Sequence, residues 1–183
     1  MNVIIRESCE SDGAAISELA IATFGESEGP VISSLIEDLA IDITAKPMLS
    51  LVATIENRVV GHILFTNAVI TQASSSFSAV ILAPLAVDPE VQNQGIGGRL
   101  IREGIVRLKA ADVDLVFVLG YPAYYTRYGF TPARPLGYQA PYPIPQEHSD
   151  AWMVQVLRPE AAGNLDARVQ CANALDKQQY WQE

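Results

Sequence analysis

The sequence predicts an α/β (α+β) fold, in which helices flank a mixed central β-sheet, and three observations lead to this prediction. The chain opens with a strand-like run, Val3 to Arg6, and an amphipathic helix over Ala14 to Phe24. Two apolar, β-branched runs, Leu49 to Ile55 and Val59 to Ile70, are joined by a short polar turn and predict an antiparallel hairpin. A strand, a helix and a strand then follow between residues 79 and 119, an order that predicts parallel pairing.

The remaining elements of the first two thirds follow from periodicity and from proline. After the interruption GESEGP, a second amphipathic helix is predicted because apolar residues recur every three or four positions, at Val31, Ile32, Leu35, Ile36, Leu39 and Ile43. The strand Ala79 to Val87 contains Pro84, which has no N–H to donate, so a bulge or an edge is expected there. Residues 97–110 form the clearest amphipathic helix, and Leu115 to Leu119 predict a strand that is buried on both faces.

The last third predicts two more strands after an irregular segment. Five prolines between Pro132 and Pro145 indicate an irregular surface connection. Trp152 to Leu157 predict a strand. A half-buried strand is also predicted by apolar residues that alternate with polar ones, at Leu165, Ala167, Val169 and Cys171. Cys171 is thereby expected to point inward as a structural thiol and not to act as a nucleophile.

Length and composition place the chain among globular proteins of the cell interior. With 183 residues, of which 49% are hydrophobic, residues 1–183 are expected to form a single domain. Neither a basic leader nor an uninterrupted apolar run of membrane-spanning length is present, so we expect a cytoplasmic protein. Its two cysteines, Cys9 and Cys171, match no disulfide framework and no zinc or redox spacing, and no metal site is expected.

Net charge narrows the class of partner. The formal charge of −9 disfavours duplex nucleic acid, because phosphate neutralisation requires clustered Lys and Arg. A small neutral or cationic substrate fits better, and a phosphate group can still bind where backbone amides converge.

A glycine-rich segment, LAVDPEVQNQGIGGRL, joins the strand that ends at Val87 to the helix of residues 97–110. Glycines at a helix entrance let backbone N–H groups approach a phosphate, and the helix dipole favours its negative charge. The alternative interpretation is an ordinary strand-to-helix turn. The spacing is neither a dinucleotide fingerprint nor a Walker motif, since GIGG has no third glycine at the required position and no lysine follows.

Four ordered motifs resemble the GNAT superfamily of N-acetyltransferases. Its signature Q/R-x-x-G-x-G/A matches Gln92, Gly95 and Gly97. The run AYYTRYGF resembles the family's segment in which a helix carries a tyrosine and ends at a Gly-Phe pair. Upstream, VVGHILF and APLAVDPE resemble the family's third and fourth strands. The runs PLAVDPEVQNQGIG and FVLGYPAYYTRYGF are similar to the uncharacterised bacterial YhbS-like branch, from which Tyr121 departs because Asp is common there.

The resemblance implies a GNAT acyltransferase fold in which the fourth and fifth strands splay apart, and an enzyme that moves an acetyl group from acetyl-CoA to an amine. Pantetheine would lie between the splayed strands, bonded to the backbone of Leu85, Ala86 and Val87. The loop after them would hold the pyrophosphate through Gln92, Asn93, Gln94, Gly95, Ile96, Gly97 and Gly98.

Tyr125 takes the position of the family's general acid, which protonates the departing thiolate. A phenol with a pKa near ~10 and a thiol with a pKa near ~8.5 make this proton transfer chemically reasonable. The alternative is a packing role, as for most tyrosines on short apolar helices. Tyr124 and Tyr128 are interpreted as packing or cofactor-lining residues.

The sequence identifies no general base. The strand SFSAVILAPLAV contains no acid, and Glu28, Glu37 and Asp38 are better interpreted as solvated carboxylates. His62 is better interpreted as a strand histidine with its hydrogen bonds satisfied, and His148 offers no clear role.

Two other functions fit the same motifs. One is a noncatalytic, regulatory CoA-binding protein, against which Tyr125 argues; the other is acetylation of a protein amine instead of a small molecule. The sequence favours no membrane partner and leaves both a monomer and a homodimer open.

Overall fold

The computed structural model describes residues 1–71, 76–162 and 166–182. Within these residues, nine strands form one mixed sheet in which the path β1-β2-β3-β4-β5-β8-β6 is extended by β9, which pairs with β3 and β7. The strands are β1 (Val3–Glu7), β2 (Leu49–Ile55), β3 (Arg58–Thr71), β4 (Ala79–Val87), β5 (Leu115–Leu119), β6 (Thr131–Pro132), β7 (Tyr138–Gln139), β8 (Trp152–Val156) and β9 (Ala167–Gln170). The predicted hairpin of β2 and β3 and the parallel pairing of β4 with β5 are confirmed.

Helix α1 (Gly13–Ile41) consists of two helical halves that meet at Gly25, where φ is 83°. Glycine tolerates this left-handed backbone without a steric cost, so the chain can reverse there. The two halves lie side by side, because the hydroxyl groups of Ser17 and Ser33 are in contact and Gly29 packs against the backbone of Ile21. The kink confirms the predicted break between two helices and corrects its extent, because Gly25 alone departs from helical geometry and the rest of GESEGP continues the helix.

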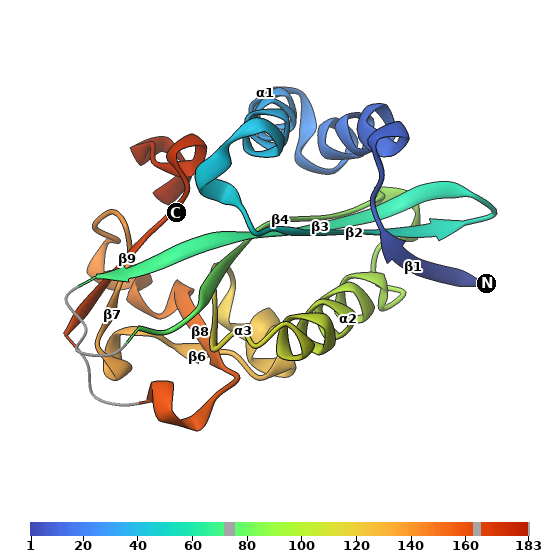
Figure 1. Ribbon diagram of the computed structural model, residues 1–183. Helices are drawn as coiled ribbons and strands as arrows, with labels where there is room; N and C mark the ends of the chain where they lie inside the picture. Colours follow the sequence, from blue (N-terminus) through green and yellow to red (C-terminus); the bar gives the residue numbers. More distant parts are fainter. Residues whose placement is uncertain (72–75, 163–165, 183) are drawn as a thin grey trace.

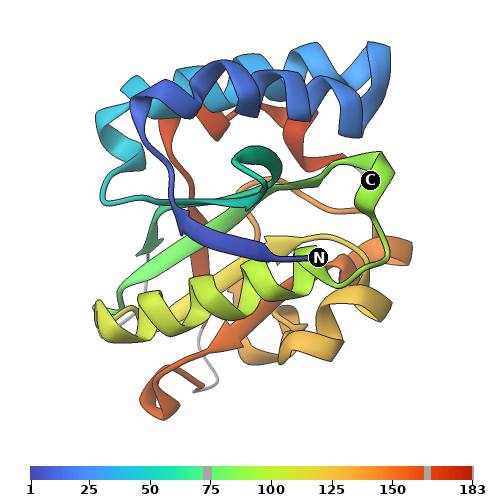
Figure 2. The ribbon, with the colours of Figure 1, turned by 90° about the vertical axis from the view of Figure 1, so that its right-hand side faces the viewer.

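The helices α1 and α2 (Ile96–Ala110) cover opposite faces of the sheet (Figure 1). Each face has its own apolar cluster: Leu35, Leu39 and Trp152 belong to the cluster on the α1 face, and Phe65 and Leu100 to the cluster on the α2 face. Figure 2 shows the same layers from the side, with β1 crossing between the two helices.

Strands β4 and β5 pair over only three residues before they part. Their parallel register runs from Ala79↔Leu115 to Ile81↔Phe117, although β4 continues to Val87 and β5 to Leu119. The register between β3 and β4 also shifts at Ile63/Phe65, next to Pro84, which confirms the expected bulge. The result is the splayed pair of strands that the resemblance implies.

The last third of the chain corrects part of the sequence analysis. The segment from Pro132 to Pro145 is not wholly an irregular surface connection, because it includes β7, in which Tyr138 is fully buried and donates its hydroxyl hydrogen bond to the carbonyl of Ala161 at 2.6 Å. In β9 the predicted alternation holds for the buried Ala167 and Val169. Leu165 lies outside the described residues, and Cys171 follows the strand as a half-buried thiol whose pKa is raised to about 12 by burial.

No helix in the described parts of the chain combines the length and the apolar character that a membrane crossing requires.

Candidate active site

The predicted cofactor loop borders a cavity of about 530 Å³ at the entrance of α2. Four segments contribute to it: α1 through Thr23, the end of β4 with the loop after it, the first turn of α2, and the short α3 (Pro122–Tyr125) with the turn that follows. Its lining residues are Thr23, Leu85, Val87, Gln92, Asn93, Gly95, Ile96, Gly97, Gly98, Tyr124, Arg127 and Tyr128.

The entrance of α2 is built to receive an anion. Gly95 is the N-cap residue, with φ at 83°, and it supplies no side chain to bond the first N–H groups of the helix. The amides of the first turn therefore keep their donors for another acceptor, and the dipole of this 15-residue helix adds positive potential at that end. Arg127 is the charged residue among those that line the cavity, and its positive charge adds to the positive potential of the helix N-terminus.

The end of β4 presents alternate backbone groups to the gap between β4 and β5. Asp88 N–H donates to the carbonyl of Val60 at 2.9 Å, so alternation along an antiparallel pair turns the backbone of Ala86 toward β3 and that of Leu85 and Val87 toward the gap. The carbonyl of Val87 accepts hydrogen bonds from Gln92 Nε2 at 2.9 Å and Thr23 Oγ1 at 3.2 Å. These bonds tie the loop and α1 to the last residue of the strand.

Two tyrosines cover the glycines at the helix entrance. A Cβ placed on Gly97 would lie 2.5 Å from the hydroxyl of Tyr124, and one on Gly98 would collide with the phenol of Tyr128. Arg127 lies over the Tyr124 ring at 5.0 Å and Arg102 over the Tyr128 ring at 5.1 Å, both within cation–π range. Burial and the neighbouring phenol of Tyr128 raise the pKa of Tyr124 to about 12, so this phenol is neutral at physiological pH.

Tyr125 lies behind this lining. It is 9% exposed, and its ring contacts those of Tyr124 and Phe130 edge to face, with centroids 5.1 and 5.5 Å away. The same ring packs against Gly120, which directly follows β5. The ring of Tyr125 therefore lies at the end of β5, and Tyr125 is not among the residues that line the cofactor cavity.

Most of the residues predicted for the cofactor line one cavity, and two do not. Ala86 is buried with its backbone toward β3, and Gln94 is an exposed residue of the loop. Thr23 and Arg127 join the lining although the sequence analysis did not select them. Nothing in the sequence indicates that Thr23 contacts Val87 of β4, which lies 64 positions away. Arg127 could have been selected, because a basic residue inside AYYTRYGF is a signal for an anion site.

The candidate bases lie away from this cavity. Glu28, Glu37 and Asp38 are exposed on α1, as expected for solvated carboxylates. His62 is 1% exposed on the α1 face, and its Nε2 bonds Ser50 Oγ at 2.9 Å, while its Nδ1 has no hydrogen-bond partner among the described residues. Burial lowers the pKa of His62 to about 4, so the imidazole is neutral near pH 7. The sequence predicted a histidine with its hydrogen bonds satisfied, and the structure shows a hydrogen bond at Nε2 only.

A group of three or more His, Cys, Asp or Glu side chains suited to a metal ion is not found in the described residues.

Comparison with known proteins assigns the family. Residues 48–132 match the acetyltransferase (GNAT) domain. The chain is 46% identical to the uncharacterised N-acetyltransferase YjhQ of Escherichia coli (strain K12), over 90% of this chain and 89% of that protein. It is 32% identical to the uncharacterised N-acetyltransferase YhbS of the same strain, over 70% of this chain and 73% of the relative.

Two solved structures have the same fold. The crystal structure of E. coli YhbS in complex with CoA superposes with a TM-score of 0.85 at 27% identity, covering 97% of this chain and 93% of that one. A GNAT family acetyltransferase from Brucella melitensis in complex with acetyl-CoA gives a TM-score of 0.74 at 27% identity, over 96% and 99% of the two chains. The chain belongs to the GNAT family of acetyltransferases.

Proposed function

We propose that the protein transfers the acetyl group of acetyl-CoA to an amine. The observation that carries this proposal is the cavity at the α2 entrance, where a long helix directs unbonded amides toward a space lined by glycines and Arg127. A pyrophosphate needs a concentration of N–H donors and positive potential, and the chain as a whole, with a net charge of −9, otherwise repels anions. The CoA and acetyl-CoA complexes of the two similar structures support the same ligand.

In this proposal, Gly95, Gly97 and Gly98 hold the pyrophosphate with their backbone amides, and Gln92 and Asn93 complete the loop around it. Leu85 and Val87 bond the pantetheine arm, since their backbone groups face the gap between β4 and β5. The rings of Tyr124 and Tyr128 lie over Gly97 and Gly98 and border the same space.

The acceptor's nitrogen attacks the thioester carbonyl, so that a C–N bond forms and the C–S bond breaks. Tyr125, whose ring packs at the end of β5, donates its phenolic proton to the sulfur, the amine releases one proton to solvent, and the tyrosinate takes one proton back from solvent. Tyr125 acts here as the general acid because its neighbours Tyr124 and Tyr128 are turned toward the helix entrance instead.

A screen with labelled acetyl-CoA tests the activity. Small amines, amino acids, aminoglycosides and peptides with a free N-terminus or lysine are incubated with the protein, and label transfer is measured. We expect transfer to a small amine that is abolished by heat-inactivating the protein. Binding of acetyl-CoA without transfer to any acceptor class would favour the regulatory alternative, and transfer to peptides alone would favour a protein acceptor.

A further inference from the structure

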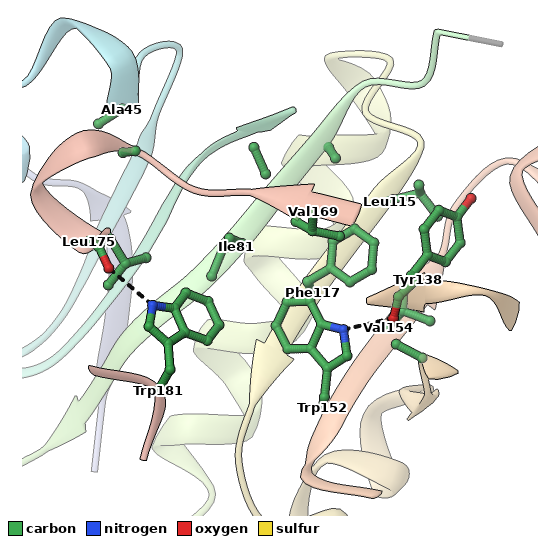
Figure 3. Packing of buried hydrophobic residues seen from close by; sticks show 14 of the residues in the cluster. Ala45, Ile81, Leu115, Phe117, Tyr138, Trp152, Val154, Val169, Leu175 and Trp181 are labelled. Carbon is green, nitrogen blue, oxygen red and sulfur yellow. Dashed lines mark hydrogen bonds between the residues drawn. The ribbon is translucent and has the colours of Figure 1, made fainter. Parts of the chain in front are cut away.

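The α1 face of the sheet is packed differently at its two ends. Toward β5 and β8, aromatic rings fill the space: Trp152 stacks on Phe117 with centroids 5.1 Å apart and meets the ring of Trp181 edge to face at 5.6 Å (Figure 3). Toward β2 and β3, a cavity of about 370 Å³ remains between α1 and the sheet. Among the described residues that border it, His62 carries the one aromatic ring.

Apolar side chains from three parts of the fold border this cavity. Ile16 lies on the first half of α1, Ile36 on the second half, and Leu64 on β3. Sites for small molecules in proteins are of this kind, with a volume of several hundred Å³, a mainly apolar surface and a few polar groups. The cavity is therefore suited to the apolar body of a small ligand.

This cavity is separate from the donor cavity at the α2 entrance. The two share no lining residue. His62 and Leu64 belong to β3, and β4 lies between β3 and the gap in which we place the pantetheine. A ligand beside His62 and Leu64 therefore occupies a site of its own and does not take the place of CoA.

A chain of polar groups reaches His62 along one wall of the cavity. Ser8 Oγ–H donates to Ser50 Oγ at 2.7 Å, and Ser50 Oγ lies 2.9 Å from Nε2 of His62. The Nδ1 atom of the same ring is buried and has no partner among the described residues. Because the great majority of buried polar atoms have a hydrogen-bond partner, this exception points to a ligand that supplies one.

Two carboxylates give the mouth of the cavity a negative charge. Glu10 and Glu37 border the cavity and are exposed, and neither forms an ion pair with a described residue. No Lys or Arg is found among the described residues that line the cavity. Carboxylates without a counter-ion attract a cation and repel an anion.

We infer that this cavity binds a small organic cation, whose apolar body packs between Ile16, Ile36 and Leu64 and whose ammonium group lies beside Glu10 and Glu37. The bound cation joins the two halves of α1 to the sheet, because Ile16 and Ile36 belong to different halves of the helix. This site does not depend on acetyl transfer.

Calorimetric titrations of the full chain at pH 7 with three probes test this inference. The probes share a phenyl body: 2-phenylethylamine is positively charged, 2-phenylethanol is neutral and 3-phenylpropionate is negatively charged. The amine should bind at one site per chain and about tenfold more tightly than the alcohol, and the propionate should not bind. A saturating concentration of CoA should leave the affinity for the amine unchanged, because the donor cavity is separate.

Three variants separate the contribution of the charge from that of the apolar body. Glu10→Gln and Glu37→Gln should each weaken binding of the amine by about two- to fivefold, the range of a solvent-exposed ion pair, and leave binding of the alcohol unchanged. Ile36→Ala should weaken the amine and the alcohol by the same factor, at least about threefold, because it removes contact with the shared phenyl body.

Glu18→Gln and Ile32→Ala are the matched controls. Glu18 is an exposed carboxylate on the first half of α1, Ile32 is a half-buried isoleucine on the second half, and neither borders the cavity. Both variants should bind the amine as the wild type does.

Each of five results would overturn the inference: binding of none of the probes, equal affinity for the amine and the alcohol, tighter binding of the propionate, loss of amine binding at saturating CoA, or unchanged amine affinity in all three cavity variants. None of them bears on acetyl transfer, which the screen with labelled acetyl-CoA tests separately.

Discussion

The hydroxyl of Tyr124 lies directly over Gly97, so that a Cβ on this glycine would come within 2.5 Å of it. This contact joins the entrance of α2 to α3 and leaves no room for a side chain at position 97. Gly97→Val should displace the Tyr124 ring into the cavity and weaken acetyl-CoA binding by at least about tenfold, because the pyrophosphate loses its approach to the backbone. Calorimetry measures the affinity.

Gly13→Val is the control for this substitution. Gly13 also lies in the first turn of a helix, and a Cβ there meets nothing within 4 Å. Its affinity for acetyl-CoA should match that of the wild type. A folded Gly97→Val protein with unchanged affinity would show that QNQGIG is only a turn.

Tyr125→Phe should lower the turnover number by about 10²- to 10⁴-fold, the range typical of lost general acid–base catalysis, and leave the affinity for acetyl-CoA nearly constant. The ring contacts with Tyr124, Phe130 and Gly120 survive this change, so the fold should be retained. Steady-state kinetics with the acceptor found in the screen and a separate binding titration measure the two effects.

Tyr124→Phe and Tyr128→Phe each remove one hydroxyl from the lining of the cofactor cavity. They should change the affinity for acetyl-CoA while the turnover number stays within a few-fold of the wild-type value. Full turnover of Tyr125→Phe, measured where the chemical step limits the rate, would rule Tyr125 out as the acid.

The buried imidazole of His62 should make the fold sensitive to mild acid. The pKa of His62 is about 4 in the folded chain, whereas the ordinary value of 6.5 applies to the unfolded chain. Between pH 6.5 and pH 4 the unfolded state therefore binds a proton that the folded state does not bind. The stability present above pH 6.5 is therefore lost as the pH falls toward 4, by about 3.5 kcal/mol at most at ~1.4 kcal/mol per pH unit. Denaturant unfolding at pH 7, 6 and 5 measures the slope.

His62→Gln removes this titration and should flatten the slope between pH 6.5 and 4. His148→Gln, at a histidine whose side chain is 46% exposed, should leave the slope unchanged. An identical pH dependence in the wild type and in His62→Gln would contradict the assignment.

A second acid-sensitive group is Asp12, which Arg6 holds by two hydrogen bonds of 2.7 and 2.9 Å. The guanidinium lowers the pKa of Asp12 well below its ordinary value, so the stabilisation is complete above pH 3.8 and is lost as the pH falls further. Because the Arg6 side chain is 43% exposed, solvent screens the pair, and we expect Asp12→Asn to cost about 1–2 kcal/mol at pH 7. Thermal unfolding at pH 7 and pH 3 measures both effects, and a variant as stable as the wild type at pH 7 would contradict them.

The parts of the fold that follow from local periodicity could be predicted from the sequence. Helix α2 separates apolar Leu100 and Ile101 from charged Arg102 and Glu103, and the hairpin of β2 and β3 needs only two apolar runs and a turn. The glycines before α2 likewise predict an anion site, because the physics of a helix N-terminus depends on neighbouring residues alone.

The other features of the fold and of the site depend on packing between distant parts of the chain and could not be predicted from local patterns. Tyr138 is buried inside a proline-rich segment because it bonds Ala161 across the fold, which no local pattern encodes. The same holds for Thr23, whose bond to Val87 brings α1 to the cofactor cavity, and for Trp181, whose place against Trp152 depends on how the chain returns after β9.

The measurement that tests the central claim most directly is a calorimetric titration of the wild-type protein with acetyl-CoA, accompanied by thermal melting. We predict saturable binding at one site per chain and a rise in melting temperature with ligand concentration, since a ligand bound only by the folded state shifts unfolding by mass action. Free acetate should do neither. Absence of heat and an unchanged melting temperature with both acetyl-CoA and CoA at saturating concentrations would contradict the assignment of the α2 entrance as the donor site.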